Sequence, residues 1–207
     1  MSIVKLNNNG VKNATEFGSI TGLGQLIFIK KVTASSSGTV SFVNGASSVV
    51  LDSTYKEYLF TFKNIHPQTD NVSFQFNGSD DTSSHSYDVT KTTTAFNAYH
   101  NEADSETGLG YRSGDDVAQG TGFHTLTHQV SNDNDEALGG YLHLFDPSNT
   151  TFVKHFIAVI SNNNEDSHAQ VNYSGGYFNT TSAITAIQFK MSSGDIDAGD
   201  ICLYGIT

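Results

Sequence analysis

The 207-residue chain has no tryptophan, one cysteine, two prolines and a single arginine, Arg112. With only Cys202 available, no disulfide can form within the chain, and a cysteine inside a strand-like stretch is best explained as a small buried hydrophobic residue. No stretch approaches the ~20 apolar residues of a membrane-spanning helix. The opening segment MSIVKLNNNG also lacks the apolar core of a secretory signal. We therefore expect synthesis in a cytoplasm without membrane insertion.

Positive charge is scarce, with 10 lysines and arginines against 21 acidic residues and a net charge of −11. Proteins that bind nucleic acids use clustered lysine and arginine to replace the counterions of the phosphates. Attraction to an anionic membrane surface needs similar basic clusters. The sequence contains no such cluster, so we expect neither a nucleic-acid partner nor a membrane partner.

The composition favours strands over helices. Charged residues make up only 15% of the chain, whereas glycine and small polar residues are abundant, as expected for strands joined by polar turns. The 14 phenylalanines and nine tyrosines can fill a core without tryptophan. The length fits one β-sandwich domain, which we assign to residues 25–207. Residues 1–24 are polar and rich in glycine, and we expect them to form an attachment arm.

Alternating apolar residues predict an all-β fold, an antiparallel, jelly-roll-like β-sandwich of roughly ten strands with long polar loops. The stretches 58–62 and 71–76 are predicted to be neighbouring strands of one sheet, and 140–146 is predicted to pair with 152–161. Asn44-Gly45 predicts a tight hairpin turn. The last 25 residues, 183–207, are predicted to form a strand–loop–strand hairpin that closes the sandwich.

Long acidic and glycine-rich loops interrupt weak strands between residues 77 and 138, and such loops often carry binding sites. Four aromatic residues of this region could stack on sugar rings: Tyr87, Tyr99, Tyr111 and Phe123. Buried strand aromatics are the competing explanation for them. Paired carboxylates supply the hard oxygen ligands that Ca²⁺ prefers, so a structural calcium ion is a possible cofactor. The candidate ligands are Asp80, Asp81, Asp115, Asp116, Asp133 and Asp135, and solvated acidic turns are the alternative.

No established catalytic motif is present. The sequence has no G-x-S-x-G nucleophile motif, no phosphate-binding P-loop and no dinucleotide fingerprint. A carboxylate pair such as Asp104 and Glu106 could serve a glycosidase, but acidic loops are too common in this chain to make that pairing specific. We therefore expect a protein that is not an enzyme.

Four long stretches carry a family resemblance: DSTYKEYLFTFKNIHPQTDNVSFQFN, KTTTAFNAYH, GYLHLFDPSNTTFVKHFIAVIS and NTTSAITAIQFKMSSGDIDAGDICLYGI. Together they resemble virion structural proteins of tailed bacteriophages, especially marine and cyanobacterial phages, which are often described as tail-fibre-like. The likeness covers about residues 50–207 and leaves the predicted arm outside it. It consists of framework motifs and implies no catalytic residues.

The resemblance implies a β-sandwich on the virion, as a head decoration, a knob or a fibre module that contributes to particle assembly and stability. Its expected partners are other capsid or tail proteins, contacted through the arm, and further copies of the chain in a homotrimer or another symmetric oligomer. Two alternatives remain open. One is an adhesin that binds host-surface glycans through the 77–138 loops, and the other is a depolymerase of host polysaccharide.

Overall fold

The structure, a computed structural model, describes residues 25–207, and the predicted arm lies outside the described residues. These residues form twelve strands and no helix. The strands are β1 (Leu26–Ser37), β2 (Val40–Val43), β3 (Glu57–Pro67), β4 (Val72–Ser79), β5 (Lys91–Asn101), β6 (Thr107–Tyr111), β7 (His124–Val130), β8 (Leu138–Phe145), β9 (Lys154–Asn163), β10 (His168–Phe178), β11 (Ala186–Met191) and β12 (Ile196–Ile206). No helix long and apolar enough to cross a membrane occurs in this part of the chain.

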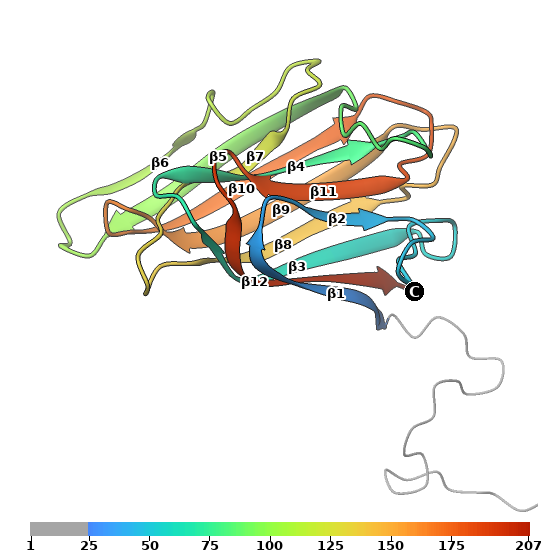
Figure 1. The fold of residues 1–207 in the computed structure, drawn as a ribbon. Coiled ribbons are helices and arrows are strands. Elements are labelled where there is room, and N and C mark those ends of the chain that lie inside the picture. Colours follow the sequence, from blue (N-terminus) through green and yellow to red (C-terminus); the bar gives the residue numbers. More distant parts are fainter. Residues whose placement is uncertain (1–24) are drawn as a thin grey trace, which may run out of the picture.

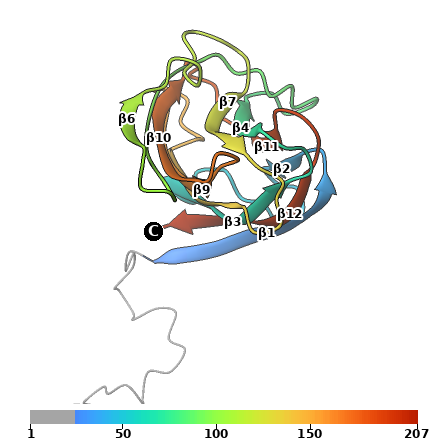
Figure 2. The ribbon, with the colours of Figure 1, turned by 90° about the vertical axis from the view of Figure 1, so that its left-hand side faces the viewer.

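The strands form two packed antiparallel sheets, which confirms the predicted β-sandwich (Figure 1). The larger sheet has eight strands in the order β1-β12-β3-β8-β9-β10-β5-β6, and the smaller has four in the order β2-β11-β4-β7. Viewed from one end, the larger sheet curves around the smaller one (Figure 2). The inner face of the larger sheet therefore meets the smaller sheet, and its outer face has no covering layer among the described residues.

Phenylalanine rings fill the space between the sheets. Phe189 of β11 lies at the centre of this core, with ring centroids 5.2–6.3 Å from those of five other phenylalanines. These neighbours are Phe42, Phe60, Phe62, Phe74 and Phe76. Edge-to-face packing, which suits the charge distribution of aromatic rings, accounts for three of the five contacts.

The pairing of β8 with β9 is confirmed, but three other pairing predictions were wrong. Residues 58–62 and 71–76 lie in different sheets, where Phe62 and Phe74 face each other across the core at 5.2 Å. Alternation shows only which residues face the core, and two strands on opposite sides of one core have the same pattern.

The prediction of a terminal hairpin was also wrong, because β11 lies in the smaller sheet and β12 in the larger one. Here too, both strands turn their apolar side chains toward the shared core. β12 is held on both sides, by β1 and by β3, which fixes the C-terminal end of the chain to the larger sheet.

The expected hairpin at Asn44-Gly45 was wrong as well. Residues 46–51 form no strand, and β2 pairs with β11 instead. Gly45 does adopt a positive φ of 79°, but Ser47 and Ser48 have positive φ angles too, so the chain coils instead of returning along β2. Val49 and Leu51 of this coil are still buried in the core.

Candidate functional site

The outer face of the eight-stranded sheet is unusually apolar. We call the exposed hydrophobic side chains on this side of the sheet, taken together, the outer sheet face. Its members from β1, β5, β6, β8, β9 and β10 are Leu26, Phe28, Phe96, Leu109, Tyr111, Tyr141, Ile157 and Tyr173. Among the large hydrophobic residues that are exposed in residues 25–207, only Phe152, in the loop between β8 and β9, lies elsewhere.

A continuous row of side chains crosses five adjacent strands of this face. The register places Tyr141 beside Val159, Val159 beside Tyr173, Tyr173 beside Phe96, and Phe96 beside Tyr111. Phe96 and Tyr173 are stacked, with ring centroids 5.0 Å apart and an interplanar angle of 8°. This row forms a ridge, and we call it the aromatic row.

A groove of about 390 Å³ runs next to the aromatic row. Its floor is Gly175, where a side-chain carbon would meet no atom closer than 3.6 Å, and aromatic side chains such as Phe145 and Tyr177 line it. The outer sheet face thus combines a ridge and a groove, both apolar.

Behind this face, the inner side of β5 and β10 is polar. Asn172 Nδ2 donates a hydrogen bond of 2.7 Å to Thr127 Oγ1, which in turn donates one of 2.7 Å to Asn162 Oδ1. Gln170 Nε2 donates to Asn162 Oδ1 and to the backbone carbonyl oxygen of His128. These side chains are all buried, and their mutual hydrogen bonds offset the cost of burying them. The network ties β7 to β9 and β10.

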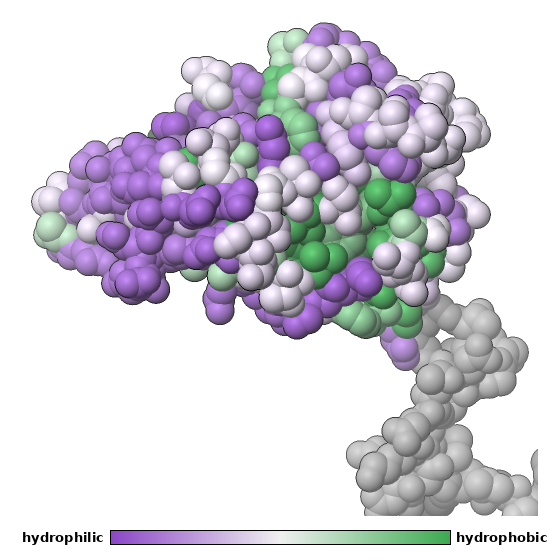
Figure 3. Space-filling view, viewed as in Figure 1, coloured by the Kyte–Doolittle hydropathy of each residue, from purple (hydrophilic) through white to green (hydrophobic). Residues whose placement is uncertain are grey.

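This network borders a polar cleft of about 200 Å³. The cleft is lined by Asn97, Tyr99, Glu106, Arg112, His128, Gln129, Asn164, Asp166, His168 and Gln170. Hydrophilic side chains dominate this end of the molecule, over β5 and β6 (left in Figure 3). Below, this set of residues is called the polar cleft.

Several charged groups of the polar cleft have partners in or beside it. Glu106 Oε1 accepts a hydrogen bond of 3.2 Å from the Tyr99 hydroxyl, and this bond to a carboxylate raises the pKa of Tyr99. Asp115 Oδ2 lies 3.0 Å from His128 Nδ1 and 3.3 Å from Arg112 Nε. Burial alone would raise the pKa of Asp115, but the contact with His128 and the charge of Arg112 outweigh it and lower that pKa.

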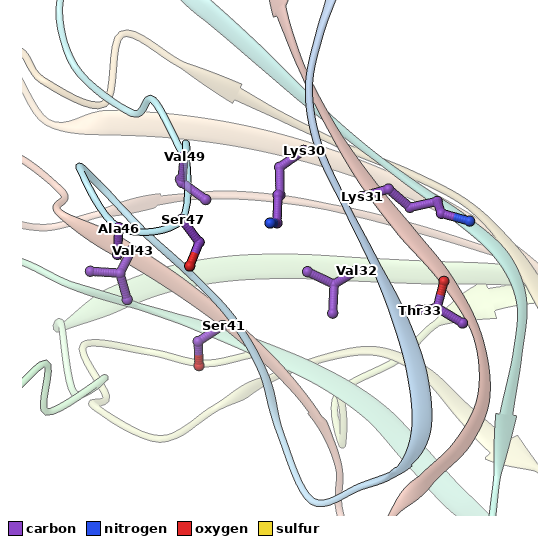
Figure 4. A pocket seen from close by; sticks show the side chains of 9 residues that line it. All are labelled: Lys30, Lys31, Val32, Thr33, Ser41, Val43, Ala46, Ser47 and Val49. Atoms are coloured by element: carbon purple, nitrogen blue, oxygen red, sulfur yellow. The ribbon is translucent and has the colours of Figure 1, made fainter.

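A second hollow of about 450 Å³ lies between the edge strands β1 and β2 (Figure 4). Lys30 points into it, while Lys31 points away and pairs with Asp200 at 3.2 Å. The remaining lining consists of small aliphatic and hydroxyl side chains from β1, β2 and the coil after β2, including Val32, Ser41 and Ser47. Its polar groups do not converge on a common point, so it offers less of a binding site than the polar cleft.

The four aromatic residues proposed as sugar contacts do not come together. Tyr99 points to the inner side of β5 and lines the polar cleft, whereas Tyr111 belongs to the outer sheet face on the opposite side of the same strand pair. Tyr87 contacts His85 within its own loop, and Phe123 lies under the Lys190 ammonium at 4.5 Å. Of the four, Tyr99 is the one that lines the polar cleft.

The proposed calcium ligands are also spread over the molecule, and most already have partners. Asp81 accepts hydrogen bonds from the backbone N–H groups of residues 83–86, and these bonds hold the pKa of its carboxyl far below the usual range. Asp80 accepts one from Thr180, Asp116 accepts one from Tyr111, and Asp115 contacts the cation of Arg112.

Asp133 and Asp135 are exposed in the loop between β7 and β8. No group of three or more histidine, cysteine, aspartate or glutamate residues suited to a metal ion occurs within residues 25–207. The calcium site stays a prediction from the sequence.

The sequence patterns missed the other side chains of the polar cleft, above all Asn97, Arg112, His168 and Gln170. One pattern could have indicated them. In β10 the polar residues His168, Gln170, Asn172 and Ser174 alternate with Val171 and Tyr173, which gives one face of the strand four polar residues in succession. Alternation does not show that this polar face is the buried one.

Comparison with known protein families, with curated proteins and with solved structures finds no match to this chain.

Proposed function

We propose that this chain is a non-enzymatic structural protein of a bacteriophage-type virion, displayed on the particle and assembled into a symmetric oligomer through its outer sheet face. The observation that carries this proposal is the concentration of exposed hydrophobic side chains on that one face. Soluble monomers rarely expose contiguous apolar patches beyond a few hundred Å², so such a face favours a protein partner. The resemblance to phage virion proteins supports the same function.

A second copy of the chain is the partner that the face fits best. In an isologous dimer the same surface serves both subunits, so it must complement itself. The outer sheet face does so in shape, because the aromatic row of one copy can enter the Gly175 groove of the other.

The row and the groove cross the same strands and lie two residues apart along β10, at Tyr173 and Gly175. A twofold axis that runs across the strands would therefore place the row of each copy over the groove of the other.

Sedimentation velocity of the full chain and of two charge variants tests this contact. Tyr173→Asp places a carboxylate in the aromatic row, and we expect it to convert oligomer to monomer because the charge would have to be buried. Phe152→Asp is the matched control, since Phe152 is 69% exposed and lies off the face, and it should leave the oligomer intact. A wild-type chain that stays monomeric at all concentrations, or two variants that behave alike, would contradict the proposal.

Cryo-electron microscopy of the intact phage particle tests the virion assignment itself. We expect density for this sandwich on the head or the tail, repeated by the local symmetry of the particle. Absence of the chain from every particle would refute the assignment, whatever its oligomeric state in solution.

A further inference from the structure

We propose that the polar cleft is a binding site for one neutral sugar ring, a pyranose unit of a glycan. This site does not depend on the outer sheet face, because the two surfaces lie on opposite sides of β5 and β10. It differs from the sequence-based sugar hypothesis in its residues, which include His168 and Gln170 of β10 and retain only Tyr99 of the four proposed aromatics.

A buried amide without a complete set of partners forms part of the cleft. Asn97 is 4% exposed and donates a hydrogen bond of 3.2 Å from Nδ2 to Gln170 Oε1. No donor within residues 25–207 reaches its Oδ1, although Asn97 lines the cleft. This oxygen therefore keeps an acceptor position that a donor from a ligand in the cleft can use.

Other groups around the cleft also keep free hydrogen-bonding capacity. Arg112 contacts Asp115 through Nε, and the structure shows no hydrogen bond from its terminal Nη groups to residues of the described chain. Asp166 accepts a hydrogen bond from Gln129 at Oδ2, which leaves Oδ1 as an acceptor. The cleft therefore offers both donors and acceptors, the combination that neighbouring sugar hydroxyls require because each can donate and accept.

The charge and polarity of the cleft disfavour anionic and apolar ligands. The carboxylates of Glu106 and Asp166 would repel phosphate or an acidic sugar, and the only arginine is already paired with Asp115. An apolar ligand would leave the donors and acceptors of the lining side chains without partners. The volume of about 200 Å³ lies below the ~300–1,000 Å³ of sites for drug-sized ligands, so it suits a single ring.

The cleft is also pre-organised. The Tyr99 ring packs over Gly108, where a side-chain carbon would lie 2.6 Å from the ring, and it meets the His168 ring at a centroid distance of 5.1 Å. These two contacts hold the ring, and its hydroxyl donates a hydrogen bond of 3.2 Å to Glu106 Oε1. Behind the cleft, Thr127 and Asn162 hold Gln170 in place. Rigid polar groups lose little entropy on binding, which favours even a small ligand.

The test is an NMR titration of ¹⁵N-labelled full-length protein with the methyl glycosides of glucose, galactose, mannose and N-acetylglucosamine. We expect at least one of them to shift the side-chain amide signals of Asn97 and Gln170. Two variants then weaken binding by about tenfold or more: Asn97→Ala, which removes the free acceptor, and Gly108→Ala, which displaces the Tyr99 ring while every polar group is kept. Gly110→Ala is the matched control, because a side-chain carbon there would meet nothing within 4 Å.

Each outcome decides between the alternatives. Folded wild-type protein whose amide signals do not move with any of the four glycosides would overturn the proposal. Shifts confined to the outer sheet face, or shifts caused by inorganic phosphate or methylamine and not by the glycosides, would overturn it too. If Tyr173→Asp disrupts the oligomer but leaves these shifts unchanged, the sugar site stands independently of the assembly.

Discussion

Phe96 of β5 and Tyr173 of β10 stack face to face on the outer face of the larger sheet, with ring centroids 5.0 Å apart. On the opposite side of the same two strands, Asn97 and Asn172 are buried at 4% and 5% exposure. At this pair of neighbouring positions the aromatic residues therefore lie outside and the amides inside. The outer side of these strands is therefore suited to protein contact, and the inner side to a polar ligand.

Truncation of Phe189 should be the most damaging single core change, because its ring contacts five other phenylalanines. We expect Phe189→Ala to lower the free energy of unfolding by about 3–5 kcal/mol, through lost burial and the cavity that remains. Phe152→Ala, at an exposed loop position, should change it by less than about 0.5 kcal/mol. Urea unfolding monitored by circular dichroism measures both, and equal losses would contradict the central role of Phe189.

Deletion of residues 196–207 should abolish soluble folding. It removes β12, which pairs with both β1 and β3. It also exposes the core residues against which Ile201 and Leu203 of β12 pack. The expected result is insoluble protein, or a product without a cooperative thermal transition. A truncated protein with an unchanged melting temperature would refute this prediction.

The adjacent glycines Gly175 and Gly176 should respond differently to alanine. A side-chain carbon at Gly176 would lie 2.5 Å from the backbone oxygen of Thr92, so we expect Gly176→Ala to destabilise the fold by about 1–3 kcal/mol. At Gly175 the nearest atom would be 3.6 Å away, and Gly175→Ala should be close to neutral. Thermal unfolding of the two variants provides the comparison, and the reverse order would be inconsistent with this packing.

Stability should fall as the pH drops from 6.5 toward 4, because His124 is buried in its neutral form. Burial and the nearby charge of Lys91 lower the pKa of His124 from 6.5 to about 4. Between these values the unfolded chain binds a proton that the folded chain does not, so acidification favours unfolding by up to about 1.4 kcal/mol per pH unit.

The variant His124→Gln should reduce this slope, whatever its effect on stability at pH 7. Phe152→Ala, at an exposed position without an ionisable group, is the control and should leave the slope unchanged. Urea unfolding at several pH values between 4 and 7 measures the slope for each protein. Identical slopes for wild type and His124→Gln would show that another group is responsible.

The fold class and the core were predictable from the sequence because they depend on local patterns. Alternation places Phe60, Phe74 and Phe189 on the apolar faces of their strands, and all three are fully buried. The assignment of strands to sheets was not predictable, since β3 and β4 present the same pattern to the core from opposite sides. Strand β6 was missed because its residues TGLGY are glycine-rich and mostly exposed.

The polar cleft was even harder to predict from the sequence. Tyr99 was identified as a candidate, but its partners come from three separate strands and three loops, and no short motif joins them. The pattern in β5 also suggests the wrong face, because Phe96 points to solvent and Asn97 inward. The hydrogen-bond network around Thr127 determines which face of β5 and β10 is buried. That network forms only when β7 packs over β9 and β10.

The position of β12 between β1 and β3 has a consequence for how the protein folds. The strands of the larger sheet cannot pair in the order in which they occur along the chain. The first strand, β1, pairs in that sheet only with the last, β12, where Leu26 lies opposite Ile206. Closing so long a loop makes folding slow, in the range of milliseconds to seconds typical of sheets with distant pairings. Until β12 arrives, one edge of β3 stays open, with its backbone N–H and carbonyl groups free to pair with other chains. The strand that completes the sheet is therefore also its protection against aggregation.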